Sequence, residues 1–465
     1  MLLVVDENFL RNFQFSAGTL QVPFVTKFKI STGELISSRA LSCRIDSILV
    51  AHFIADGSRP RVARNAAAIS EKRVPGKRLK PQFRRRIRLW DTDEHPISST
   101  YYLSLNPAGT RLAFTDHMTF HVYVFDLFTG KLLRALYPDS SEEALFIRLP
   151  AELVLKLKAM NIINSMYFSH RFLDDSLLII TASLPSIRMR NEDENVQIDY
   201  FNAPVMVTKS INSNQMLRCV EFQSWPDTIP GVFEHPDASL VPETGIVFLP
   251  YCRGWPAQGS EIPDENLPAD WNPFREEFYL KNIHQLAVYD TGGRFIRFIG
   301  KLDSRFEELR LGYLVNNEAF VRRQNNRYYA ADRYSGKILI SNQEFELEDS
   351  IVIWENATPV TPAIDHSSEP LRYMLETFRL NFPWRIVDFL DAGTSIYALV
   401  TSNTQTLVYK LNLQKGKTER FLLHQQLERE TATYHLLQPA ESGVVAIGLA
   451  TSSDDVTHYF ELQLP

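Results

Sequence analysis

Few residues in this chain have the types and the spacing that an active site needs. No glycine-rich phosphate loop, HExxH motif or GxSxG motif is present. His117 and His121 have a spacing that can bind metal on a helix, but here they straddle the junction of two predicted strands. The cysteines, Cys43, Cys219 and Cys252, lie far apart and lack CxxC spacing. We therefore expect no metal, no cofactor and no catalytic residues that can be recognised in the linear sequence.

Two loops rich in proline and aromatic residues are the best candidates for a binding surface. They cover residues 225–242 and 254–274. An exposed tryptophan beside proline offers a large contact area at a low entropic cost. We expect partner contacts at Trp255, Trp271 and Phe274, and the alternative is that these rings pack onto neighbouring loops.

A strongly basic stretch interrupts an otherwise acidic chain. The formal net charge is −6, yet residues 59–88 contain twelve Lys and Arg against one acid, a local balance of about +11. Residues 56–84 are predicted to be a flexible insertion because they are rich in charge and proline and poor in core-forming residues. Arg84, Arg85 and Arg86 are candidates for contact with an acidic partner surface or with nucleic acid.

The elements that must position these residues are strands. A hairpin recurs along the chain, in which an aromatic-rich strand, a tight turn and a strand with Arg or Lys follow one another. Glycine suits such turns because they need a positive φ. Two weaker copies, around residues 93–94 and 212–214, lack the glycine. The five clear copies turn at Gly33, Gly130, Gly293, Gly336 and Gly416.

Four strands follow one another within about forty residues, which is the length of one propeller blade. The order of strand, Asn106-Pro-Ala-Gly109 turn, strand, and then Val122 to Arg134 resembles bacterial β-propellers of the NHL, YVTN and TolB-like kind, which include six-bladed proteins. The second stretch that carries the resemblance is Val288-Tyr-Asp-Thr-Gly-Gly293. The resemblance implies an all-β propeller of four-stranded antiparallel blades. Seven blades are favoured by the hairpin count, and six are the alternative.

One propeller domain is expected to span residues 1–465, with short helical insertions. The last segment contains three strands, and a fourth strand from Leu2 to Asp6 could complete that blade and close the ring. Residues 141–164 are predicted to form a helical insertion, and residues 223–277 contain the two proline- and tryptophan-rich loops. Strand character is also expected from Arg86 to Asp91, where basic and apolar residues alternate.

The function that these features favour is a non-catalytic propeller that serves as a protein-interaction scaffold or binding module. A propeller-type hydrolase or lyase is one alternative, because channel-mouth residues converge from separate blades and leave no linear motif. Binding of nucleic acid or an acidic partner through residues 59–88 is another alternative. No run of 18 apolar residues occurs, so no membrane span is expected. Without a signal peptide the expected location is cytoplasmic, or periplasmic or at the cell surface if the N-terminus is truncated or processed.

Overall fold

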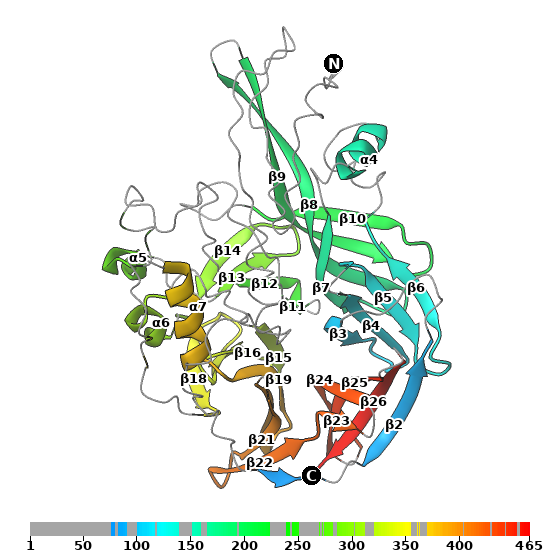
Figure 1. Cartoon of the computed structure of the whole chain (residues 1–465), viewed down its shortest axis with the longest axis vertical. Coiled ribbons are helices and arrows are strands. Elements are labelled where there is room, and N and C mark those ends of the chain that lie inside the picture. The colour runs from blue at the N-terminus through cyan, green and yellow to red at the C-terminus, as the bar shows by residue number, and fades with distance from the viewer. Residues whose placement is uncertain are drawn as a thin grey trace, which may run out of the picture.

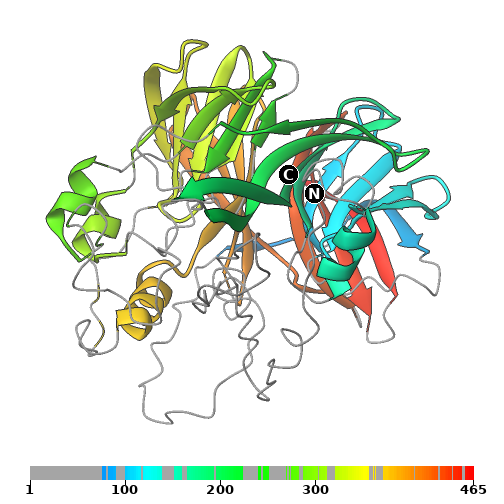
Figure 2. The ribbon, with the colours of Figure 1, turned by 90° about the horizontal axis from the view of Figure 1, so that it is seen from above.

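The computed structural model describes residues 76–79, 82–90, 100–138, 151–159, 165–223, 239–250, 269–281, 286–311, 320–354, 360, 362 and 370–465, apart from short gaps inside these ranges. In this part of the chain, six sheets stand side by side in a ring, and their strands pair antiparallel except for one short parallel pair at the edge of one sheet (Figure 1; Figure 2). The fold is therefore an all-β propeller, and the described residues form six blades. The smaller of the two expected blade numbers is the one observed.

The first three blades have four strands each, and the chain enters each blade at its innermost strand. From the inner to the outer strand, they are β3 (Thr100–Leu105), β4 (Arg111–Asp116), β5 (Val122–Asp126) and β6 (Leu132–Leu136) in blade 1; β7 (Met166–Phe172), β8 (Leu177–Glu192), β9 (Asn195–Ser210) and β10 (Met216–Glu221) in blade 2; and β11 (Ser239–Val241), β12 (Ile246–Pro250), β13 (Leu286–Asp290) and β14 (Phe295–Ile299) in blade 3.

The last three blades follow the same plan, and two of them gain a fifth strand. They are β15 (Phe320–Gln324), β16 (Arg327–Asp332), β17 (Lys337–Ser341) and β18 (Leu347–Val352) in blade 4; β19 (Arg385–Asp391), β20 (Ser395–Thr401), β21 (Thr406–Asn412), β22 (Lys417–Leu423) and β1 (Lys77–Arg78) in blade 5; and β23 (Gln426–Leu427), β24 (Glu430–Ala440), β25 (Gly443–Ser452), β26 (Thr457–Leu464) and β2 (Phe83–Leu89) in blade 6.

Ring closure uses a strand from the basic stretch. β2 pairs antiparallel with β26, from Phe83 opposite Leu462 to Leu89 opposite Thr457. The expectation that residues 2–6 supply this strand is wrong, because β2 occupies the free edge of β26; residues 2–6 themselves lie outside the described part of the chain. Strand character near Arg86 is confirmed, and closure removes a sheet edge that another chain could pair with.

The expected hairpins do not correspond one to one with the blades. β2 and β3 lie in different sheets, so the weak hairpin expected around residues 93–94 does not join two strands of one blade. The weak hairpin at residues 212–214 does join β9 to β10. The turn at Gly336 joins the second and third strands of its blade, whereas Gly130, Gly293 and Gly416 lie between the third and fourth strands. Gly33 lies outside the described residues.

An aspartate at the end of the preceding strand holds several of these turns in shape. The Asp126 carboxylate accepts hydrogen bonds from the backbone N–H groups of Thr129 (2.7 Å) and Phe128 (3.0 Å). The Asp290 carboxylate accepts one from Gly292 in the same way (2.8 Å). Although partial burial opposes it, this bonding lowers the pKa of Asp126. The sequence thus repeats because each turn uses the same local capping.

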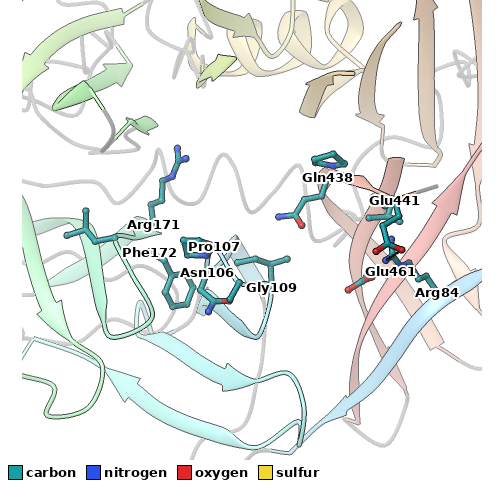
Figure 3. A pocket seen from close by; sticks show the side chains of 15 residues that line it. Arg84, Asn106, Pro107, Gly109, Arg171, Phe172, Gln438, Glu441 and Glu461 are labelled. Carbon is teal, nitrogen blue, oxygen red and sulfur yellow. Dashed lines mark ion pairs between the residues drawn. The ribbon is translucent and has the colours of Figure 1, made fainter. Parts of the chain in front are cut away.

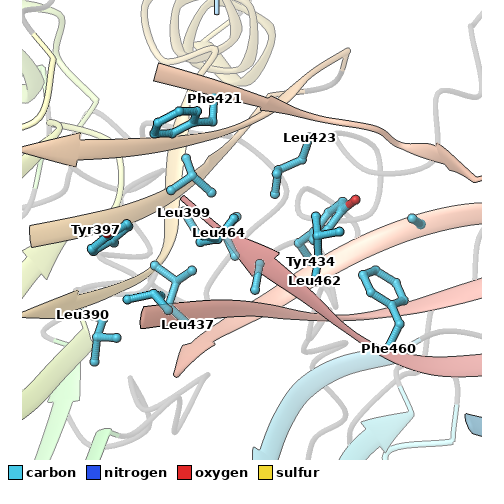
Figure 4. Close-up of a cluster of buried hydrophobic side chains, with 14 of the residues drawn as sticks. Leu390, Tyr397, Leu399, Phe421, Leu423, Tyr434, Leu437, Phe460, Leu462 and Leu464 are labelled. Atoms are coloured by element: carbon cyan, nitrogen blue, oxygen red, sulfur yellow. The ribbon is translucent and has the colours of Figure 1, made fainter. Parts of the chain in front are cut away.

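The core is divided among the contacts between neighbouring blades. Within the described residues, each of the six pairs of adjacent blades encloses its own cluster of buried apolar side chains. Figure 4 shows the cluster between blades 5 and 6, where Tyr397 and Leu399 lie on the side of Leu437, and Phe460 packs against Tyr434 with ring centroids 5.3 Å apart. Central strands are buried on both faces and therefore read as nearly continuous apolar runs. Between blades 6 and 1, Leu89 of the closing strand belongs to the buried cluster.

Four helices lie outside the sheets in the described part of the chain. α4 (Ala151–Ala159) falls within the helical insertion expected at residues 141–164. α5 (Glu276–Lys281), α6 (Ser304–Glu308) and α7 (Pro370–Asn381) lie beside blades 3 and 4 in Figure 1. None of these helices is long and apolar enough to cross a membrane.

Candidate functional site

A cavity of about 810 Å³ opens where three inner strands end on one face of the ring. The strands are β3 of blade 1, β7 of blade 2 and β24 of blade 6, so the cavity lies across the point of ring closure (Figure 3). Its wall consists of the ends of these strands, the turns that follow them and parts of blade 6. The lining residues are Arg84, 105–109, 171–173, 438–441, Val445 and Glu461.

The turn after β3 forms one wall of the cavity, and its own sequence fixes its shape. The buried Asn106 accepts hydrogen bonds from the backbone N–H groups of Thr110 (2.8 Å) and Arg111 (2.7 Å). Its side-chain amide donates to the carboxylate of Asp175 in blade 2 (2.5 Å). Gly109 has a φ of 64°, which a side chain would strain. This wall is therefore rigid and is tied to the neighbouring blade before any ligand arrives.

The closing strand braces the same turn. The guanidinium of Arg85 donates to the carbonyl oxygens of Leu127 (2.6 Å) and Gly109 (3.3 Å) and lies 3.8 Å from the Glu461 carboxylate. Arg84, which lines the cavity, is 3.9 Å from Glu441, whose side chain is 95% exposed. Such an exposed pair contributes little stability. Both charges of this pair are therefore accessible to a ligand.

The cavity carries both signs of charge. Arg84 and Arg171 supply the cations, and Glu441 and Glu461 supply the carboxylates. In Figure 3, Arg171 lies on the side of blades 1 and 2, whereas Glu441 and Glu461 lie across the opening on blade 6. Gln438 adds an amide that can donate and accept. This arrangement can hold a polar segment that bears positive and negative groups.

Deeper polar contacts join the inner strands of blades 4, 5 and 6. Arg322 of β15 donates to the Asp388 carboxylate of β19 (2.5 Å), which also accepts from the backbone N–H of Leu437 in β24 (2.6 Å). Asp388 is almost completely buried, and burial raises its pKa although Arg322 opposes the shift. β19 has a bulge at Ile386–Asp388, and such bulges re-aim side chains. Because both donors already occupy Asp388, this group holds blades together.

A buried histidine occupies the inner strand of blade 2. His170 follows an irregularity in the pairing of β7 with β8, and its Nδ1 lies 3.1 Å from the hydroxyl of Thr115. Burial lowers the pKa of His170 to about 4. The ring is therefore neutral near pH 7. Among the described residues, no group of three or more His, Cys, Asp or Glu side chains is placed to hold a metal ion.

The residues expected to bind a partner are not gathered at one site. Trp255 and Trp271 lie outside the described residues. Phe274 is half-buried and packs near Tyr373 of α7, with ring centroids 6.3 Å apart, away from the cavity lining. Of the three arginines, Arg84 lines the cavity and Arg85 braces its wall. Their role in partner binding stays a prediction.

Arg86 belongs to a different contact. Its guanidinium lies 2.5 Å from the Glu430 carboxylate at the start of β24, and His458 lies 2.8 Å from the other oxygen of that carboxylate. Lys77 of β1 pairs with Glu419 of β22 at 2.9 Å. Part of the basic stretch therefore lies across acidic residues of blades 5 and 6 of its own chain. Within the range 56–84, β1 and the start of β2 are strands, and most of the remainder lies outside the described residues.

The cavity residues that sequence reasoning missed are Arg171, Gln438, Glu441 and Glu461. They come from blades 2 and 6, which are more than 250 residues apart in the chain. The Asn106 to Gly109 turn was recognised, but only as part of a repeat. No spacing in the linear sequence brings these residues together, because the closed ring alone makes them neighbours.

No family model matches the chain, and no curated protein matches it. Solved structures with a similar arrangement include a member of the DUF4221 family from Bacteroides vulgatus, with a TM-score of 0.45 and 9% identity over 83% of this chain and 98% of that one. The β-propeller domain of Cps50 (Swd1) from Myceliophteria thermophila has a TM-score of 0.37 and 10% identity over 83% and 100%. Streptogramin B lyase has a TM-score of 0.36 and 8% identity over 82% and 98%. The expected propeller is confirmed by the six sheets of the chain itself, and these distant similarities assign no activity.

Proposed function

We propose that this chain is a non-catalytic β-propeller that acts as a binding module, and that it holds a polar segment of a protein partner in the cavity. The observation that carries the proposal is the cavity itself, which has about 810 Å³ of volume and a lining drawn from three blades. Ligand sites in proteins have volumes of about 300–1,000 Å³ and a few placed polar groups.

The walls of the cavity are held in place by contacts within the chain. Asn106 fixes the turn of blade 1, and Arg85 links that turn to the closing strand. A pre-formed site loses little conformational entropy when it is filled, so more of the contact energy contributes to affinity. Charges of both signs across the opening favour a partner segment that carries a cation and a carboxylate.

Obstruction of the cavity tests the proposal. Ala108 is exposed at the cavity wall, so Ala108→Trp should fill the opening without disturbing the core. Lys415→Trp places the same ring on an exposed turn of blade 5 and is the matched control. Tagged wild-type chain and both variants would capture partners from cytoplasmic and envelope fractions of the native source, with quantification by mass spectrometry. We expect at least one protein to be captured by the wild type and the control about tenfold more than by Ala108→Trp.

Two results would contradict this function. Equal capture by all three chains would show that the cavity does not bind the partner. Turnover of a panel of ester, phosphoester and lactone substrates by the wild type, with loss in Ala108→Trp but not in Lys415→Trp, would instead support the hydrolase or lyase alternative. Thermal unfolding of each variant, followed by circular dichroism, verifies that the chains compared are equally folded.

A further inference from the structure

The end of the closing strand leaves blade 6 and reaches the turn of blade 1. Trp90 donates its backbone N–H to the carbonyl oxygen of Gly130 (2.6 Å) and accepts a hydrogen bond from the N–H of Leu132 (3.1 Å). It thereby forms a parallel bridge with Lys131. Large apolar side chains are nevertheless exposed at this contact between the two blades. Trp90 is 50% exposed, and Phe128 of the same turn is 75% exposed.

An arginine lies flat against this tryptophan. The guanidinium carbon of Arg88 is 3.8 Å from the centroid of the Trp90 ring. Stacking of this kind fixes the plane of the guanidinium and leaves its N–H edge available to a second group. Arg88 is exposed, and no ion pair of Arg88 or Lys131 occurs among the residues that the structure describes. We call Arg88, Trp90 and Lys131 the seam platform.

The neighbouring arginines differ from Arg88 in this respect. Arg84, Arg85 and Arg86 each lie within 4 Å of a carboxylate of blade 6. Their charges are therefore balanced within the chain, and Arg88 is the arginine of β2 for which the described residues offer no carboxylate. Tryptophan and arginine are also the side chains most enriched at the energetic centres of protein interfaces.

We propose that the seam platform docks an acidic peptide segment of a protein partner. The Arg88 guanidinium would bind one carboxylate of the segment in bidentate fashion, and the exposed Trp90 ring would cover an adjoining apolar residue. Lys131 would face a second carboxylate. Nucleic acid fits less well, because strong phosphate binding needs several unbalanced cations and the platform offers two. The site is separate from the cavity and does not depend on its occupant.

Fluorescence anisotropy with synthetic peptides tests this docking site. The probe is a fluorescein-labelled 12-residue peptide in which Glu alternates with Ser around one central Leu, and its copy has Gln in place of Glu. We expect the acidic probe to bind the whole chain and the Gln copy to bind about tenfold more weakly. Arg88→Ala and Trp90→Ala should each weaken binding of the acidic probe about tenfold, since each removes half of the stacked pair.

Controls separate the platform from general charge effects. Arg218→Ala removes an exposed arginine from the outer strand of blade 2 and should leave binding unchanged. Ala108→Trp should also leave it unchanged, because the cavity is a different site. Arg88→Lys retains the charge but loses the planar stack, and we expect an affinity between those of the wild type and Arg88→Ala.

Three results would overturn the proposal. The first is equal binding of the acidic probe by the wild type and Arg88→Ala. The second is tighter binding of a single-stranded oligonucleotide than of the acidic probe, with loss in Arg88→Ala, which would assign the platform to nucleic acid. The third is binding of the probe only after Asp93→Asn and Glu94→Gln are introduced, which would show that an acidic segment of this chain is the occupant.

Discussion

Replacement of Gly130 by alanine should loosen the closing strand selectively. Gly130 has a φ of 70°, and a Cβ atom added there would lie 1.9 Å from the carbonyl oxygen of Arg88 in β2. Gly416 is the matched position, since it lies in the corresponding turn of blade 5. It has a φ of 58° and no atom within 4 Å of an added Cβ. The two substitutions therefore share the same backbone strain and differ in whether they push against a neighbouring strand.

The expected magnitudes follow from these contacts. Alanine in the left-handed region costs about 1 kcal/mol, which should be the whole effect of Gly416→Ala. In Gly130→Ala the Arg88 carbonyl has to move away, and two hydrogen bonds between Trp90 and the blade 1 turn are lost or lengthened. Each such bond contributes about 1 kcal/mol. We therefore expect Gly130→Ala to lower the free energy of unfolding by about 3 kcal/mol.

Thermal unfolding and amide hydrogen exchange together measure the effect. Gly130→Ala should have the lower midpoint of the two variants, and its exchange should accelerate along β2 and β26. Gly416→Ala should accelerate exchange only near its own turn. If both variants lowered the midpoint equally, and β2 were equally protected in both, close approach of β2 to the turn would not stabilise ring closure.

Four further substitutions test charged and titratable groups of the blades. Arg86→Met removes a partner of the mostly buried Glu430 and should lower the free energy of unfolding in urea by about 1–2 kcal/mol. Arg84→Met should lower it by less than about 0.5 kcal/mol, because the Arg84 pair is exposed. Equal losses in the two variants would contradict this ranking. Because the pKa of His170 is about 4 in the folded chain and near 6.5 when unfolded, wild-type stability should fall by up to about 3 kcal/mol as the pH falls through this window. His170→Gln should abolish that loss in urea titrations at pH 7.5 and 4.5, and an unchanged loss would contradict the assignment. Burial raises the pKa of Asp388, so the contribution of Asp388 to stability falls as the pH rises above the ordinary carboxyl pKa of 3.8. Asp388→Asn should therefore gain stability relative to the wild type between pH 4 and 7. A difference in stability between the two chains that does not change with pH would contradict this.

The hairpins could be predicted from the sequence because each one is local. An aspartate at the end of a strand, such as Asp126, and a glycine with positive φ, such as Gly130, specify a turn without help from the rest of the chain. The number of blades was harder to predict from the sequence, because the residues of a turn do not show which strands of a blade the turn joins. Gly336 joins the second and third strands of its blade, and the signal around residues 93–94 lies between strands of different blades.

The candidate site depends on contacts that no local signal encodes. Arg171 and Glu441 become neighbours of the same cavity only because β2 completes blade 6 beside blade 1. Contacts between residues so far apart in the sequence form only when the whole ring closes. Position along the repeat predicted that residues near Asn106 form a turn, but not that the turn would line a cavity.

The basic stretch illustrates that a local charge balance does not by itself identify a partner. The excess of Lys and Arg over acidic residues in 59–88 is typical of a segment that binds a polyanion. In the structure, β2 places Arg84, Arg85 and Arg86 beside Glu441, Glu461 and Glu430 of the blade that it completes. Opposite charges favour the pairing of this strand with this blade edge over other edges of the ring. The same charges therefore help to specify ring closure, and Arg88, which lacks such a partner among the described residues, is the arginine of β2 that we propose for partner binding.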